Sequence, residues 1–143
     1  MVMKMEEKIL ISNSVEETMN IAEKFMDEIT TGTVISLIGD IGAGKTAFTK
    51  GIGRSLEIED TISSPTFTLI KEYEGRLKLN HIDAYRLENA SSDPLALYDL
   101  MEDDAVVVIE WSNFIEGLEP DYQIEIEYID DNSRKITFKG EQI

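Results

Sequence analysis

The segment from residue 35 to residue 46 constrains this chain most, because it contains the pattern G-x-x-x-x-G-K-T between Gly39 and Thr46. An apolar run over residues 34–38 precedes the pattern and predicts a buried strand, while residues 45–56 predict a helix. The pattern indicates a phosphate-binding P-loop only between a strand and a helix. Both flanks are present, so we expect a phosphate site at this turn.

Each position of the loop has a physical role. Gly42 and Gly44 permit backbone conformations in which successive N–H groups point at one anion. The following helix directs free N–H groups and its positive dipole end at the same anion. Lys45 is expected to reach the β- and γ-phosphates, and the Thr46 hydroxyl to ligate Mg²⁺. The residues expected to bind the nucleotide are Ile41, Gly42, Ala43, Gly44, Lys45, Thr46 and Ala47.

Length and charge limit the kind of protein this is. The 143 residues are enough for one domain, which we expect to span residues 1–143. Thirteen Lys and Arg against 29 Asp and Glu give a net charge of −16. Such a charge opposes direct binding to nucleic acid, which needs a basic face. It also means that ATP binding must depend on the loop, Lys45 and a metal rather than on general attraction.

Other features of the sequence indicate a cytoplasmic protein. It has no cysteine, which excludes disulfides and thiol chemistry. Residues 1–11 contain four charged residues and lack the apolar core of a signal peptide. The longest apolar run, residues 105–109, is far too short to cross a membrane.

Hydrophobic periodicity predicts three helices and seven strands. The helices are expected over residues 14–29, where Ser14 and Glu17 fit a capping box, and over 45–56 and 94–101. The strands are expected over residues 8–11, 34–38, 67–73, 77–83, 105–109, 122–129 and 135–139. Two β-hairpins inside an α/β pattern predict a three-layer P-loop NTPase fold with a mixed parallel and antiparallel sheet.

Two carboxylates are the candidates for catalysis. P-loop enzymes need a carboxylate near the metal, at the carboxyl end of a buried strand. Glu110 ends the strand over residues 105–109, and Asp83 ends the strand over residues 77–82. Either could hold Mg²⁺ or orient the attacking water. Asp103 and Asp104 stand at the opposite end of their strand and are poor candidates.

Several other residues have two interpretations from chemistry alone. His81, the single histidine, is structural or catalytic, with the structural role favoured. Arg86 is a phosphate ligand or part of a surface ion pair. Trp111 is a core residue or covers the nucleotide, with core favoured. The chain has no N-K-x-D segment of the kind that guanine-specific P-loop proteins use, so we favour ATP.

Four motifs in order resemble the TsaE family of bacterial tRNA threonylcarbamoyladenosine biosynthesis ATPases. They are GDIGAGKT at residues 39–46, SPTF at 64–67, HIDAYR at 81–86 and IEW at 109–111. The P-loop alone is shared by many families, but the four together are specific. The similarity runs from Ser14 nearly to the end of the chain. Ile41 replaces a usual Leu, and Ala47 stands where a second Thr is common.

The resemblance implies an ATPase that works with two partners, TsaB and TsaD, to modify adenosine 37 of ANN-decoding tRNAs, and that meets tRNA only through them. It implies Lys45 on phosphate, Thr46 and Glu110 on Mg²⁺, and Asp83 in hydrolysis. Residues 64–67 would form a switch-like segment, and His81, Tyr85 and Arg86 would support the site or the partner contact. Arg134 and residues 12–18 are our candidates for approaching the adenine.

Two other functions stay open from the sequence. The first is a small-molecule kinase on the same fold. Small P-loop kinases usually carry an Arg-rich lid, and the four arginines of this chain form none, which counts against this function. The second is a nucleotide-binding adaptor that does not hydrolyse ATP.

Overall fold

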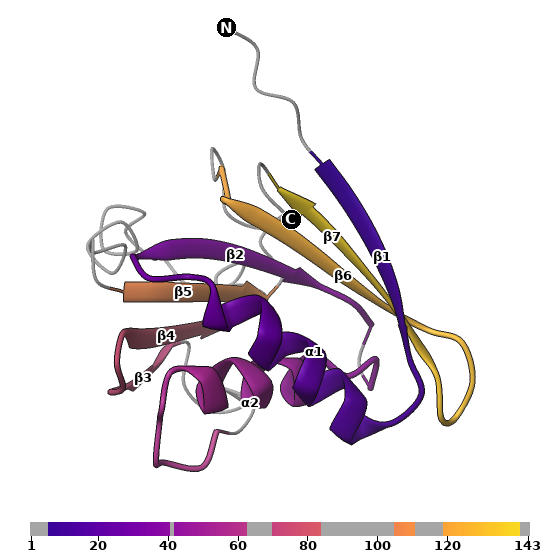
Figure 1. Cartoon of the computed structure of the whole chain (residues 1–143), viewed down its shortest axis with the longest axis horizontal. Helices are drawn as coiled ribbons and strands as arrows, with labels where there is room; N and C mark the ends of the chain where they lie inside the picture. The colour runs from indigo at the N-terminus through magenta and orange to yellow at the C-terminus, as the bar shows by residue number, and fades with distance from the viewer. Residues whose placement is uncertain (1–5, 41, 63–69, 84–104, 111–118, 141–143) are drawn as a thin grey trace, which may run out of the picture.

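The computed structural model describes residues 6–40, 42–62, 70–83, 105–110 and 119–140. They form one seven-stranded sheet in the order β1-β7-β6-β2-β5-β4-β3 (Figure 1). The strands are β1 (Glu6–Ser12), β2 (Thr33–Ile38), β3 (Ile70–Tyr73), β4 (Lys78–Asp83), β5 (Ala105–Glu110), β6 (Tyr122–Tyr128) and β7 (Arg134–Gly140). The helices are α1 (Val15–Asp27) and α2 (Lys45–Ser55).

The sheet is mixed, as predicted. Its centre is parallel, because β2 pairs with β5 and β6, and β5 pairs with β4, all in parallel. Antiparallel pairs complete both sides: β1 and β7 beside β6, and β3 beside β4. Every residue of β5 is buried, so both faces of the sheet are covered at its centre. These features confirm the α/β class with a mixed parallel and antiparallel sheet.

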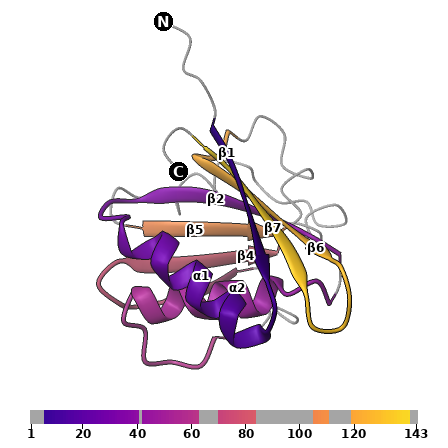
Figure 2. The ribbon, with the colours of Figure 1, turned by 45° about the vertical axis from the view of Figure 1, so that its right-hand side comes forward.

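Helices α1 and α2 pack on each other and cover the same face of the sheet, as Figures 1 and 2 both show. Phe48 and Ile52 of α2 and Met26 of α1 are fully buried against that face. A Cβ atom on Gly51 would lie 2.2 Å from the carbonyl oxygen of Met19. Only a residue without a Cβ therefore allows the two helices to approach this closely.

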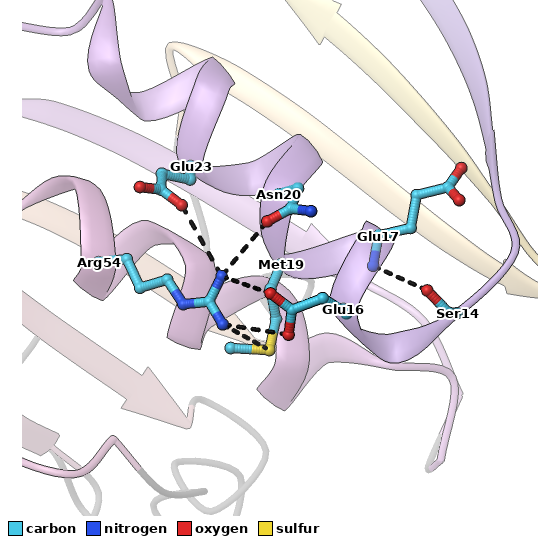
Figure 3. Close-up of polar contacts among 7 residues, drawn as sticks. All are labelled: Ser14, Glu16, Glu17, Met19, Asn20, Glu23 and Arg54. Carbon is cyan, nitrogen blue, oxygen red and sulfur yellow. Dashed lines mark hydrogen bonds and ion pairs between the residues drawn. The ribbon is translucent and has the colours of Figure 1, made fainter.

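Polar contacts join the helices at their exposed edge (Figure 3). The guanidinium of Arg54, on α2, lies 3.1 Å from a Glu16 carboxylate oxygen and 3.8 Å from one of Glu23, both on α1. It also donates to the Asn20 side-chain oxygen over 3.3 Å. At the start of α1 the Ser14 hydroxyl accepts the Glu17 N–H over 2.9 Å, which confirms the predicted N-cap.

The carboxyl ends of both helices meet at Arg76, in the β3–β4 turn. Its guanidinium donates to the carbonyls of Met26 and Ile29 at the end of α1, over 2.9 and 2.8 Å. It donates also to the carbonyl of Ser55 at the end of α2, over 2.8 Å. Carbonyls in the last turn of a helix lack intrahelical partners, so this cation satisfies two helix ends at once.

The observed elements follow the predicted ones within a few residues. The N-terminal helix ends at Asp27 rather than at residue 29, and β7 begins at Arg134 rather than at residue 135. The predicted helix over residues 94–101, the 64–67 segment and the strand residues 67–69 lie outside the described residues, as do Ile41, Tyr85, Arg86 and Trp111. Within the described part of the chain, no helix is long and apolar enough to cross a membrane.

Candidate nucleotide-binding site

The P-loop connects the carboxyl end of β2 to the first residue of α2. Gly42 and Gly44 have φ values of 83° and 114°, a region that residues with a Cβ rarely adopt. A Cβ on Gly39 would lie 2.7 Å from the Ile126 carbonyl oxygen, so this glycine lets β6 pass close to the loop. The predicted turn, with glycine where the backbone needs it, is present.

The amino end of α2 is left open to an anion. Its N-cap is Gly44, and no described side chain caps it. The first turn of α2 contains no acidic residue, whereas α1 has a Ser14 cap and Glu16 and Glu17 in its first turn. Uncapped N–H groups and the positive end of the helix dipole form an anion site. Of these two helices, α2, which follows the P-loop motif, therefore has no side-chain hydrogen-bond acceptor at its amino end.

Lys45, Glu110 and His81 form a buried cluster beside this helix end. Lys45 Nζ lies 3.4 Å from Glu110 Oε1, and His81 Nε2 lies 2.6 Å from Glu110 Oε2. The Lys45 and Glu110 side chains are each 9% exposed, and His81 is fully buried. Parallel pairing of β4 with β5 positions the cluster. Asp83 is the register partner of Glu110, and His81, two residues before Asp83 in the same strand, lies on the same face of the sheet.

Glu110 is held in its ionised form. Burial favours the neutral acid, but the hydrogen bond from His81, the charge of His81 and the charge of Lys45 outweigh it, so the pKa of Glu110 lies below its ordinary value. The carboxylate accepts, so His81 Nε2 donates. A buried ionised carboxylate at the carboxyl end of a central strand is suited to a divalent cation.

The other predicted site residues lie at the same edge of the sheet. Asp83, half-buried, ends β4 as the register partner of Glu110 at the end of β5, so the two predicted carboxylates lie side by side at this edge. Thr46, half-buried, lies in the first turn of α2. The described residues contain no group of three acidic or histidine side chains around a single point. The Thr46 hydroxyl and the Glu110 carboxylate fit a cation that binds together with the nucleotide, in which phosphate and water oxygens would supply the remaining ligands.

A cleft of about 420 Å³ opens beside the loop. Gly39, Asp40, Ala43 and Lys45 line it from the P-loop side, and residues 125–128 line it from β6. This volume is in the usual range for a small-molecule site.

Arg134 contacts the P-loop from outside, a contact that the sequence did not reveal. Its Nε donates to the Ala43 carbonyl over 2.9 Å, although the residues are 91 positions apart. No pattern of neighbouring residues in the sequence predicts such a contact. Ser12 and Thr18, from the other segment proposed near the adenine, bond to each other through their hydroxyls over 2.6 Å and hold α1 to β1. The adenine contacts of Arg134 and residues 12–18 stay predictions.

Comparisons with known proteins agree on one family. The family described as "Threonylcarbamoyl adenosine biosynthesis protein TsaE" matches residues 12–136. A protein of that name from Bacillus subtilis is 44% identical over 126 residues, covering 86% of this chain and 79% of the relative. One from Aquifex aeolicus is 36% identical over 133 residues, covering 90% and 93%. The crystal structure of Bacillus subtilis YdiB superposes with a TM-score of 0.79 at 35% identity, covering 96% of this chain and 88% of YdiB.

Proposed function

Because this chain belongs to the TsaE family of threonylcarbamoyl adenosine biosynthesis proteins, we propose that it hydrolyses ATP during the formation of threonylcarbamoyladenosine at adenosine 37 of ANN-decoding tRNAs. Its partners are TsaB and TsaD, which the family resemblance implies. The net charge of −16 suits a protein that meets tRNA through such partners rather than directly.

One observation supports the proposal above the others. The uncapped amino end of α2 adjoins a lysine and an ionised, buried carboxylate, which are the groups that a nucleotide phosphate and its metal need. A phosphate group meets the free N–H groups of the loop and of α2. It also meets Lys45, whose ammonium group lies 3.4 Å from Glu110.

A few residues share the work of binding and hydrolysing ATP in this proposal. Lys45 leaves Glu110 for the β- and γ-phosphates and holds them in place. Thr46 and Glu110 would hold Mg²⁺, which neutralises charge that develops on the phosphate oxygens. Glu110 and Asp83 are the carboxylates that we propose to orient the attacking water. His81 bonds one oxygen of Glu110, while the other oxygen, now beside Lys45, can change partner.

Steady-state phosphate release tests the proposal. We expect slow release from the chain alone, because no described arginine reaches the phosphate site as a finger, and such a finger contributes roughly 10³- to 10⁵-fold. We expect acceleration when TsaB, TsaD and substrate tRNA are added. Fast release from the chain alone, unchanged by the partners, would contradict partner-dependent catalysis, and transfer of the γ-phosphate to a small molecule would establish a kinase instead. Binding without hydrolysis under all conditions would establish an adaptor.

A further inference from the structure

The guanidinium of Arg134 lies against the outer side of the P-loop. Besides the Ala43 carbonyl, its Nη2 donates to the carbonyl of Gly42 over 3.5 Å, a longer contact. Both acceptors belong to the turn that carries the phosphate-binding motif. Ala43 is 2% exposed, so the residue is enclosed by its surroundings.

The same guanidinium is anchored in the β6–β7 hairpin. Its Nη1 donates to the carbonyls of Asp130 and Ser133, over 2.6 and 3.0 Å. Its Cζ lies 4.8 Å from the centre of the Tyr128 ring, within the range of a cation–π contact. The turn is itself ordered, because the Asp130 carboxylate accepts the N–H groups of Asn132 and Ser133. Arg134 therefore connects a rigid hairpin to the loop.

Because of the geometry of the peptide bond, the contact between Arg134 and the Ala43 carbonyl also determines the direction of an N–H group in the loop. In a trans peptide the C=O and N–H groups point in opposite directions. The carbonyl of Ala43 points at Arg134, so the N–H of Gly44, in the same peptide, points away from Arg134. The neighbouring N–H, that of Ala43, is occupied by the Asp40 carbonyl over 3.0 Å. The Ala43–Gly44 peptide is thus the one whose direction Arg134 sets.

We propose that Arg134 is a positioning residue for the P-loop, which holds the Ala43–Gly44 peptide so that its N–H faces the phosphate in advance of binding. The identity of the anion as a nucleotide phosphate rests on the function proposed above. Without Arg134 the peptide at Gly44, whose φ of 114° only glycine adopts readily, is free to rotate. Part of the nucleotide's binding free energy is then used to order the loop.

Arginine is required for this role, rather than positive charge alone. The guanidinium is a planar fork that serves Ala43 and the hairpin carbonyls together. A lysine at the same position has one compact ammonium group, which keeps the charge near the loop but cannot span both sets of acceptors. Arg134→Lys therefore separates positioning from electrostatic attraction.

The test compares Arg134→Ala and Arg134→Lys with wild type and with Arg54→Lys, the matched control. Arg54 is also held by several acceptors, but on α1 and away from the loop. The first readout is amide hydrogen exchange at residues 39–44 in nucleotide-free protein, together with the melting temperature. The second is the affinity for Mg²⁺-ATP by calorimetry.

We expect faster exchange at the loop in both Arg134 variants, with ATP affinity reduced roughly tenfold in Arg134→Ala and at least roughly threefold in Arg134→Lys. Arg54→Lys should leave both readouts unchanged. Wild-type exchange and affinity in Arg134→Lys would overturn the proposal, because charge alone would then suffice. A lower melting temperature with unchanged exchange and affinity would overturn it too, because Arg134 would serve the hairpin only.

The exchange measurement also separates this inference from the proposed function. If the wild-type chain binds no ATP, the proposed function is wrong, but exchange at residues 39–44 in the nucleotide-free variants still decides whether Arg134 holds the loop.

Discussion

His81 Nε2 lies 2.6 Å from Glu110 Oε2, in a pair that joins neighbouring parallel strands beneath the P-loop. The other oxygen of Glu110 lies 3.4 Å from Lys45 Nζ. The buried carboxylate of Glu110 thus contacts two groups. His81 holds it in place, and Lys45 is expected to leave it for the phosphates of the nucleotide. His81 thus belongs to the buried cluster with Glu110 and Lys45, and its contribution to the site stays a prediction.

Replacing His81 should affect both the stability of the fold and phosphate release. His81→Leu leaves Glu110 without its buried donor and should destabilise the protein by about 1–3 kcal/mol. His81→Gln keeps an N–H donor near the position of Nε2 and should recover most of the stability. We expect phosphate release to follow the same order. Urea unfolding and a phosphate assay measure both, and equal behaviour of the Leu and Gln variants would show that the hydrogen bond is unimportant.

The low pKa of Glu110 predicts a dependence of stability on pH. A carboxyl whose pKa is lower in the folded than in the unfolded state stabilises the fold above its ordinary pKa, near 4.5. That stability is lost as the pH falls from 4.5 through the lower, folded value. In nucleotide-free protein with a chelator, the stability difference between wild type and Glu110→Gln should therefore shrink below pH 4.5. A constant difference from pH 6 to pH 3 would contradict the assignment.

Arg76 should matter for folding far more than Arg54. Arg76→Ala leaves carbonyls at the ends of both helices without their cation, and we expect a loss of about 2 kcal/mol. Arg54→Ala removes ion pairs on an exposed edge and should cost clearly less. Chemical denaturation of the two variants beside wild type measures both, and a larger loss for Arg54→Ala would refute this ranking.

Most of the fold could be predicted because its signals are local. The apolar run of β5, the alternation in β6 and the Ser14 cap each follow from a few neighbouring residues. The P-loop and the two strand-end carboxylates could be located for the same reason, since a parallel sheet brings the carboxyl ends of its strands to one edge.

The remaining contacts depend on distant pairs that no local pattern encodes. The Arg76 contacts with two helix ends and the Arg134 contact with Ala43 arise only after the chain has folded. The bond from His81 to Glu110 depends on the register of β4 against β5, and a shift by one residue would turn His81 to the other face.

Glu110→Gln and Asp83→Asn should reveal which carboxylate serves hydrolysis. Each change keeps the shape of the side chain and removes its charge at the shared edge of the sheet. We expect Glu110→Gln to bind ATP while phosphate release, measured with the partners present, falls about 100-fold. Turnover equal to wild type would remove Glu110 from the mechanism, and a loss in Asp83→Asn alone would assign the role to Asp83.

Calorimetric titration of Mg²⁺-ATP into wild type and Lys45→Ala tests the central claim, that the amino end of α2 and Lys45 form a phosphate site. Removing the lysine removes a charge-assisted contact with the phosphates. We expect wild type to bind and the folded variant to bind roughly 10- to 100-fold more weakly. Equal affinity of the two folded proteins would contradict the assignment of the site.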